Sequence, residues 1–269
     1  MPELPDVELY KHRLDETALH RTIAVVTVSD ARILRDLPAA KFAEAVEGRR
    51  FEGSLRHGKH LLAKLDKGGW VTLHFGMTGD LVPCGEKSDE PPYTRVRFDF
   101  ADGGALAYTN RRMLGHVGLT DDAETFLRGE GLGPDALDPA FDRAAFAQAL
   151  GSGRRSLKSA LMDQAAMAGV GNIFADEILF QARLHPETKV AQLTDKQTET
   201  LFRQTKAVLE TAIACGAGSE QFQGQLPQGF IIPQRKKDGR CPRCGTAIGT
   251  LKAGGRTAYF CPNCQKPKA

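Results

Sequence analysis

Residues 168–179 read AGVGNIFADEIL, and this stretch decides the architecture of the second half of the chain. Glycines at 169 and 171 form a turn, and a helical pattern follows from Ile173 to Ala182. Such a turn presents backbone N–H groups at the start of a helix, where they can bind an anion such as phosphate. Glycines also permit helices to pack closely, so the turn alone leaves both interpretations open.

Helical patterns continue on both sides of this turn, from Phe141 to about Ile213. Between 157 and 164, the residues at positions 157, 160, 161 and 164 recur at the spacing of one helix face. Farther on, Thr194 and Gln197 have the form of a capping box and predict the start of another helix. The second half of the chain is therefore expected to be mainly helical.

The first 120 or so residues are expected to be mainly β-structure. A helix comes first, because Val7, Tyr10 and Leu14 recur at helical spacing. The glycine- and proline-rich segment 128–135 ends the β-pattern and is typical of a linker. Between the helix and the linker, strands are expected at 23–28, 60–65, 70–75, 96–100 and 105–108.

The chain begins Met1-Pro2-Glu3-Leu4-Pro5. Proline at position two normally allows removal of the initiator methionine, which would leave Pro2 as a free secondary amine. A free α-amino group has a pKa of about 7.7 to 8.0, so a useful fraction is unprotonated near neutral pH. Pro2 and Glu3 are therefore a candidate nucleophile beside a candidate acid. An ordinary explanation also stays open, because Pro5 is typical of the first turn of a helix.

Four of the six cysteines form a metal-binding pattern. Four thiolates at this spacing predict one closed, tetrahedral zinc site, which is structural because no coordination position is left for water or substrate. The intervening residues predict a hairpin with strands at 245–250 and 257–260, joined through 252–255. The pattern consists of two C-x2-C pairs separated by sixteen residues: Cys241, Cys244, Cys261 and Cys264.

Composition and charge narrow the class of protein. With 269 residues, 41% hydrophobic and 26% charged, the chain is typical of a globular protein of one or two domains. The net charge is only +3, but residues 235–269 carry nine lysines and arginines against Asp238 alone. Such a cluster suits a polyanion, although a solvated basic surface is the alternative. No segment has the pattern of a membrane span or signal peptide, so we expect a cytoplasmic protein.

Four separated motifs together resemble the formamidopyrimidine-DNA glycosylase family, the Fpg/Nei group of base-excision repair enzymes. The segment 163–179 is similar to that family's helix-two-turn-helix motif, and Leu4-Pro5 is closer to the Fpg branch than to the Nei branch. The resemblance covers essentially the whole chain. The four motifs are 2–5 (PELP), 56–62 (RHGKHLL), the turn and helix at 169–180, and the four-cysteine module.

The resemblance implies an α+β fold with an N-terminal β-sandwich, flanking helices, a helical helix-two-turn-helix domain and a zinc-finger β-hairpin. It also implies a monomer that binds damaged double-stranded DNA, does not act at a membrane and holds one structural zinc ion. The expected boundaries are 1–127 for the catalytic domain, 128–140 for a hinge, 141–234 for the helical domain and 235–269 for the zinc finger.

The chemistry that the resemblance implies is that of a bifunctional enzyme. Pro2, once Met1 is removed, would attack C1′ of the damaged nucleotide and form a Schiff base. Glu3 would protonate the deoxyribose ring oxygen as the sugar opens. β- and δ-elimination would then cut the strand. The damaged nucleotide must leave the base stack first, because its C1′ is otherwise out of reach.

Five further residues are implied to touch DNA. Lys59, Asn172 and Arg256 would hold the phosphates that flank the lesion, and Lys59 would also support the lyase step. Met77 and Arg112 would fill the gap left in the duplex. Without the resemblance, Met77 is equally compatible with core packing, Lys59 with a solvated charge and Asn172 with a helix cap.

The chain departs from the Fpg pattern at a loop that normally carries two arginines followed by Phe-Gly. An ungapped match to Gly115 places Arg112 at the first arginine, Met113 at the second and Leu114 at the phenylalanine. A match to the arginine pair would select Arg111 instead and would need one extra residue. Leu114 can still supply an apolar wedge.

Two other departures concern the damaged base. The segment 217–240 is shorter than in typical Fpg proteins, where it carries the loop that caps 8-oxoguanine. Asp6 stands where the Fpg branch usually has glutamate, and either it or Glu8 is expected to orient the amine. We therefore expect retained cleavage at abasic sites and poor excision of 8-oxoguanine. The alternatives are a DNA-binding family member without base excision, or a zinc-ribbon module on an unrelated β domain.

Overall fold

The computed structural model describes residues 1–85 and 87–267 and divides the chain into two compact units. The first, called unit 1, comprises Met1–Pro2 and Val7–Glu130. The second, unit 2, comprises Glu3–Asp6 and the chain from Gly131 onward. Each unit has its own hydrophobic core. Among the described residues, no helix is both long and apolar enough to cross a bilayer.

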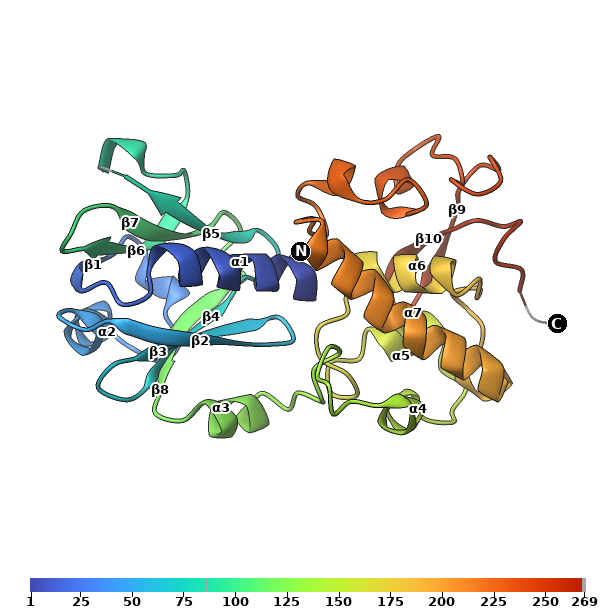
Figure 1. Ribbon diagram of the computed structural model, residues 1–269, viewed down its shortest axis with the longest axis horizontal. Helices are drawn as coiled ribbons and strands as arrows, with labels where there is room; N and C mark the ends of the chain where they lie inside the picture. Colours follow the sequence, from blue (N-terminus) through green and yellow to red (C-terminus); the bar gives the residue numbers. More distant parts are fainter. Residues whose placement is uncertain (86, 268–269) are drawn as a thin grey trace. The chain divides into compact units, whose positions relative to one another are not determined.

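Unit 1 is a β-sandwich of two four-stranded antiparallel sheets, with strand orders β1-β6-β7-β5 and β2-β3-β4-β8 (Figure 1). The aromatic rings of Phe42, Phe51 and Phe98 pack edge to face in its core. The strands are β1 Ile23–Val28, β2 Phe51–His57, β3 His60–Leu65, β4 Trp70–His74, β5 Gly79–Cys84, β6 Thr94–Phe100, β7 Ala105–Asn110 and β8 His116–Thr120.

Helices flank the sandwich. In α1 (Leu4–Thr17), Val7, Tyr10 and Leu14 are buried, as their spacing predicts. Two short helices, α2 (Ala39–Val46) and α3 (Ala123–Gly129), and the 3₁₀ turns η1 (Ala31–Ile33) and η2 (Lys87–Asp89) complete the unit.

Three strands and two helices of unit 1, α2 and α3, have no counterpart among the expected elements. Strands β2, β5 and β8 each contain a glycine, and β5 also contains Pro83, residues that weaken a strand pattern. Each of these three segments lies at the edge of a sheet and is extended because it pairs with the neighbouring strand. Tertiary context therefore overrides local preference at these positions.

Unit 2 is helical, as expected, and its central helix is α6 (Asn172–Gln181), which is buried on every side from Ile173 to Phe180. The capping box of Thr194 and Gln197 forms at the start of α7 and confirms that prediction. The other elements are α4 Arg143–Leu150, α5 Leu157–Leu161, α7 Asp195–Ala214, η3 Val190–Gln192, η4 Gln223–Gln225, η5 Ile232–Gln234, β9 Gly249–Ala253 and β10 Arg256–Phe260.

The zinc-finger hairpin forms, but its first strand was predicted too early. Strand β9 begins only at Gly249. The residues just after Cys244 form a turn instead, in which the Gly245 N–H donates to the Cys241 carbonyl at 2.9 Å. The two-residue turn of Gly254 and Gly255 then joins β9 to β10, with φ of 58° and 71°. Lys252 and Ala253 thus lie in the strand rather than in the turn.

Candidate active site

The Glu3 carboxylate lies at the N-terminus of α6 and is only 1% exposed. Its Oε2 accepts hydrogen bonds from the N–H groups of Gly171 at 2.8 Å and Phe174 at 3.0 Å. Its Oε1 accepts from Ile173 N–H at 2.8 Å. Unpaired backbone amides at a helix start bind anions in this way. The anion held by this glycine turn is therefore Glu3, and the backbone phosphate site considered for the turn is occupied by the chain itself.

The two glycines of the turn are required by this arrangement. A Cβ atom on Gly171 would lie 2.4 Å from Cδ of Glu3. A Cβ on Gly169, whose φ is 115°, would lie 2.5 Å from Cδ1 of Leu4. The Leu4 N–H also donates to the Gly169 carbonyl at 3.1 Å. The N-terminal segment thus fits against the turn because neither position carries a side chain.

Asp6 anchors the same segment from the other side. Its carboxylate accepts from Glu3 N–H at 2.8 Å and from Ser219 N–H at 2.9 Å, and it is 3% exposed. Burial raises the pKa of Asp6 to about 6, against the lowering effect of these hydrogen bonds. Glu8, the other carboxylate considered for this role, forms ion pairs with Arg56 and His12. Asp6 is the residue that holds Glu3.

Pro2 is buried and directly precedes Glu3. With Met1 attached, its nitrogen is a tertiary amide and has no basic lone pair. A nucleophilic Pro2 therefore requires the methionine to be removed.

Two loops of unit 1 bring the predicted gap-filling residues together. Met77 lies in the turn between β4 and β5, and Arg112 lies in the loop between β7 and β8. The two loops touch through backbone, since a Cβ on Gly76 would lie 2.3 Å from the carbonyl carbon of Leu114. The Arg112 N–H also donates to Oγ1 of Thr78 at 3.0 Å.

The apolar residue at the tip of the second loop is Leu114, which is 52% exposed. Below it, the Asn110 side-chain amide donates to the Phe75 carbonyl at 3.1 Å and to the Tyr108 hydroxyl at 3.0 Å. Both Asn110 and Tyr108 are fully buried. An exposed leucine on a rigid base has the form required of a wedge.

Lys59 lies in the two-residue turn that joins β2 to β3, closed by the pair His57 and His60. Gly58, the first residue of the turn, has a φ of 56°, a conformation that favours glycine. The turn projects Lys59 from the end of the hairpin, where its side chain is half-buried.

The four cysteines fit a zinc ion. Three of the Sγ···Sγ distances are 3.9, 3.5 and 3.6 Å, and all four sulfurs lie within 4.8 Å of one another. With Zn–S bonds of about 2.3 Å, a tetrahedral site requires sulfurs about 3.8 Å apart. The donors are Cys241, Cys244, Cys261 and Cys264, as predicted.

A buried ion pair attaches the zinc hairpin to α6 within unit 2. Nζ of Lys158 lies 2.5 Å from Oδ1 of Asp176 and donates to the Thr257 carbonyl at 3.0 Å. Oδ2 of Asp176 accepts from Tyr259 N–H at 3.1 Å and lies 3.0 Å from Arg235. Lys158 and Asp176 are both fully buried, and the sequence pattern did not reveal them.

The two predicted phosphate contacts of unit 2 lie on elements that this ion pair joins. Arg256 is exposed at the start of β10, and β10 packs on α6, whose first residue is Asn172. The Asn172 side-chain oxygen has no hydrogen-bond partner among the described residues. Both side chains thus have polar atoms with capacity to bind a ligand.

Three family models match the chain in sequence order. The formamidopyrimidine-DNA glycosylase N-terminal domain matches residues 1–117, and the H2TH domain of the same proteins matches 132–224. A zinc finger found in FPG and IleRS matches 239–267.

Whole proteins match over their full length. A formamidopyrimidine-DNA glycosylase of Listeria monocytogenes is 34% identical and covers 99% of this chain and 100% of the relative. One of Streptomyces coelicolor is 36% identical over 99% and 98%. The crystal structure of Lactococcus lactis Fpg with N7-benzyl-Fapy-dG DNA has a TM-score of 0.89 at 26% identity, covering 98% of this chain and 100% of that chain. The chain therefore belongs to the formamidopyrimidine-DNA glycosylase family.

Proposed function

We propose that Pro2 and Glu3 carry the reaction of this enzyme, a DNA glycosylase of base-excision repair that also cleaves abasic sites. The observation that carries the assignment is the Glu3 carboxylate, fixed by three backbone amides immediately after Pro2. A carboxyl group held in this way keeps one orientation, and preorganisation of this kind lowers the barrier of the step it serves. Relatives in Lactococcus lactis bind Fapy-dG DNA and abasic-site DNA.

This arrangement suggests how protons move during formation of the Schiff base. In becoming the Schiff base, the Pro2 amine forms a bond to C1′, the damaged base departs with the electron pair of its bond to C1′ and takes a proton from water, and the nitrogen loses a proton. Glu3 accepts that proton and delivers it to the ring oxygen as the bond between C1′ and that oxygen breaks. The electron pair on nitrogen completes the iminium, from which β- and δ-elimination release the sugar remnant.

Damaged double-stranded DNA is the proposed partner of a monomeric enzyme. In unit 1, Lys59 would bind a phosphate, while Met77 and Arg112 fill the gap left by the everted nucleotide. In unit 2, Asn172 and Arg256 would bind the flanking phosphates. We place the catalytic domain at 1–127, the hinge at 128–140, the helical domain at 141–234 and the zinc finger at 235–269. The proposed location is the cytoplasm, and the nucleoid if the protein is bacterial.

Base choice is proposed to differ from that of typical Fpg proteins. Leu114 replaces the aromatic wedge, and the segment 217–240 is short. The sugar chemistry does not depend on either feature, whereas recognition of 8-oxoguanine does. A panel of lesion oligonucleotides should show ring-opened purines and abasic sites processed faster than 8-oxoguanine, and equal rates would refute this specificity.

Borohydride trapping on DNA that contains an abasic site tests the assignment of the nucleophile. The mature protein, verified by mass spectrometry to lack Met1, should give a covalent adduct that is lost in Pro2→Gly. Pro5→Ala, a proline replacement three residues away, should retain the adduct. If the mature protein binds the DNA but gives no adduct, the chain is a DNA-binding member of the family without catalysis.

A further inference from the structure

Three histidines form a continuous row across one sheet of unit 1. His60 in β3 pairs with His74 in β4, and His74 pairs with His116 in β8. The ring centroids of His60 and His74 are 4.8 Å apart, and those of His74 and His116 are 5.0 Å apart. The row is independent of Pro2 and of the cysteine site, and the mechanism above does not use it.

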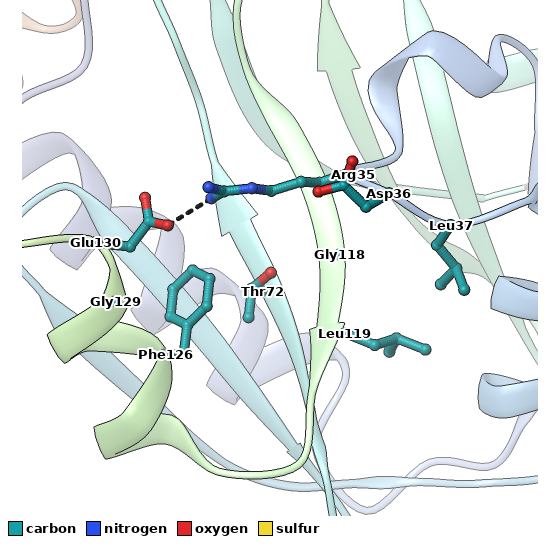
Figure 2. Close-up of a pocket in the computed structure, with 9 residues that line it drawn as sticks. All are labelled: Arg35, Asp36, Leu37, Thr72, Gly118, Leu119, Phe126, Gly129 and Glu130. Carbon is teal, nitrogen blue, oxygen red and sulfur yellow. Dashed lines mark hydrogen bonds and ion pairs between the residues drawn. The ribbon is translucent and has the colours of Figure 1, made fainter.

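A carboxylate and a guanidinium face this row. Oε2 of Glu130 lies 3.5 Å from Nε2 of His60. Nη1 of Arg35 lies 2.6 Å from Oε1 of Glu130 and 3.4 Å from Nε2 of His116. Figure 2 shows the Arg35 guanidinium pointing toward the Glu130 carboxylate, beside the ring of Phe126. The charged groups border an open pocket of about 400 Å³.

Two imidazole rings of the row have a buried nitrogen that makes no hydrogen bond to the described residues. His60 is 7% exposed, and its Nδ1 has no hydrogen-bond partner among the described residues. The same is true of Nδ1 of His74 within the described chain.

We propose that His60, His116 and Glu130 bind a divalent transition-metal ion of the zinc class. One donor atom from each residue already lies within 4.8 Å of the other two. Zn–N bonds of about 2.0 to 2.1 Å require donors about 3.4 Å apart, so the side chains must close by about 1.4 Å at most. Two imidazoles and a carboxylate suit zinc, nickel or copper and exclude a preference for calcium or magnesium.

Arg35 contacts two of the three residues that would bind the ion. Its guanidinium neutralises Glu130 and contacts His116, the two roles that a bound cation would take over. The Arg35 side chain is 44% exposed and borders the pocket, so it can leave without rearranging the core. Three protein donors beside a pocket leave a coordination position for water, unlike the closed four-cysteine site.

The ion would stiffen the loops that are proposed to touch DNA. His60 directly follows Lys59, His74 lies three residues before Met77, and His116 lies four residues after Arg112. Glu130 is the last residue of unit 1. A metal bridge would therefore tie the ends of two strands to the segment where the chain leaves the sandwich.

Metal stoichiometry of the full-length zinc protein tests the proposal. After dialysis against excess zinc chloride and removal of unbound metal, mass spectrometry of the metal content should give two zinc ions per chain. His116→Asn and Glu130→Gln, both outside the core, should each return the ratio to one. The control is His20→Asn, which removes a histidine from an exposed His–Glu pair elsewhere in unit 1, and it should stay at two.

Two further measurements distinguish a built site from loose surface binding. In protein labelled with ¹⁵N-histidine, the ring nitrogens of His60 and His116 should shift with the second equivalent of zinc, and those of His20 should not. Arg35→Gln should tighten binding by about fivefold, the worth of a partly exposed ion pair. A wild-type ratio of one, a second ion that persists in both ligand variants, or weaker binding by Arg35→Gln would overturn the proposal.

Discussion

Gly171→Ala is the most direct test of how the active site is held. The backbone at Gly171 has φ −126° and ψ −159°, which alanine adopts without strain, so the effect of the substitution is steric. The new Cβ would lie 2.4 Å from Cδ and 2.6 Å from Oε1 of Glu3, whereas ordinary contact begins at 3.4 Å. The carboxyl group must therefore move by about 1 Å, a displacement that costs about 100-fold in rate at a preorganised site.

The assay is single-turnover borohydride trapping on abasic DNA, with the dissociation constant measured separately on DNA carrying a non-reactive abasic analogue. The trapping rate should fall by about two orders of magnitude while DNA affinity changes little, because the movement affects the acid. Gly153→Ala serves as the control, since a Cβ there meets nothing within 4 Å. A folded Gly171→Ala protein that traps within threefold of the wild type would refute the positioning role of the turn.

Four further outcomes are expected. Because the pKa of Asp6 rises from 3.8 to about 6 on folding, its ionisation disfavours the native state as pH rises. The free energy of unfolding of the wild type, relative to Asp6→Asn, should fall by about 2 kcal/mol between pH 4 and pH 7, and a pH-independent difference would contradict the burial argument. Lys158→Met leaves Oδ1 of the buried Asp176 without its partner and should cost about 3 to 5 kcal/mol in a denaturant titration, whereas Lys252→Met should stay within about 0.5 kcal/mol. Leu114→Ala should leave the melting temperature unchanged and weaken binding to abasic-site DNA about tenfold, and unchanged affinity would exclude the wedge. Chelation of the structural zinc should melt the hairpin and weaken DNA binding without removing the Pro2 amine, and retained affinity in the metal-free protein would contradict this.

Local sequence patterns predicted much of the fold, because interactions between residues close together in the chain determine the elements concerned. Helix α1 follows from the spacing of its apolar residues, α7 from its capping box, and the zinc site from the spacing of its cysteines. Strands β5 and β8 could not be predicted, since distant strands pair with them and their glycines weaken the strand pattern. Strand β2 pairs with its neighbour β3, but its glycine likewise weakens the pattern.

The surroundings of the site were less predictable than its chemistry. A charged residue is exposed by default, so nothing local indicated that Lys158 and Asp176 are both fully buried. The contact of Glu3 with Gly171 joins residues 168 positions apart, and the histidine row depends on strand register. The sequence left open whether the turn binds phosphate or only permits close packing, and the anion that it holds is a side chain of the same protein.

The membership of residues 3–6 in unit 2 has a consequence for biosynthesis. Leu4 belongs to the hydrophobic core of unit 2, and the amides that hold Glu3 belong to a turn made more than 160 residues later. Residues 3–6 therefore cannot pack into unit 2 until the glycine turn has been translated. This delay gives methionine aminopeptidase its opportunity, because Met1 can be cleaved before Pro2, Glu3 and Leu4 are buried. A nascent chain stalled before the glycine turn would carry the proposed nucleophile and lack the turn that holds Glu3 beside it.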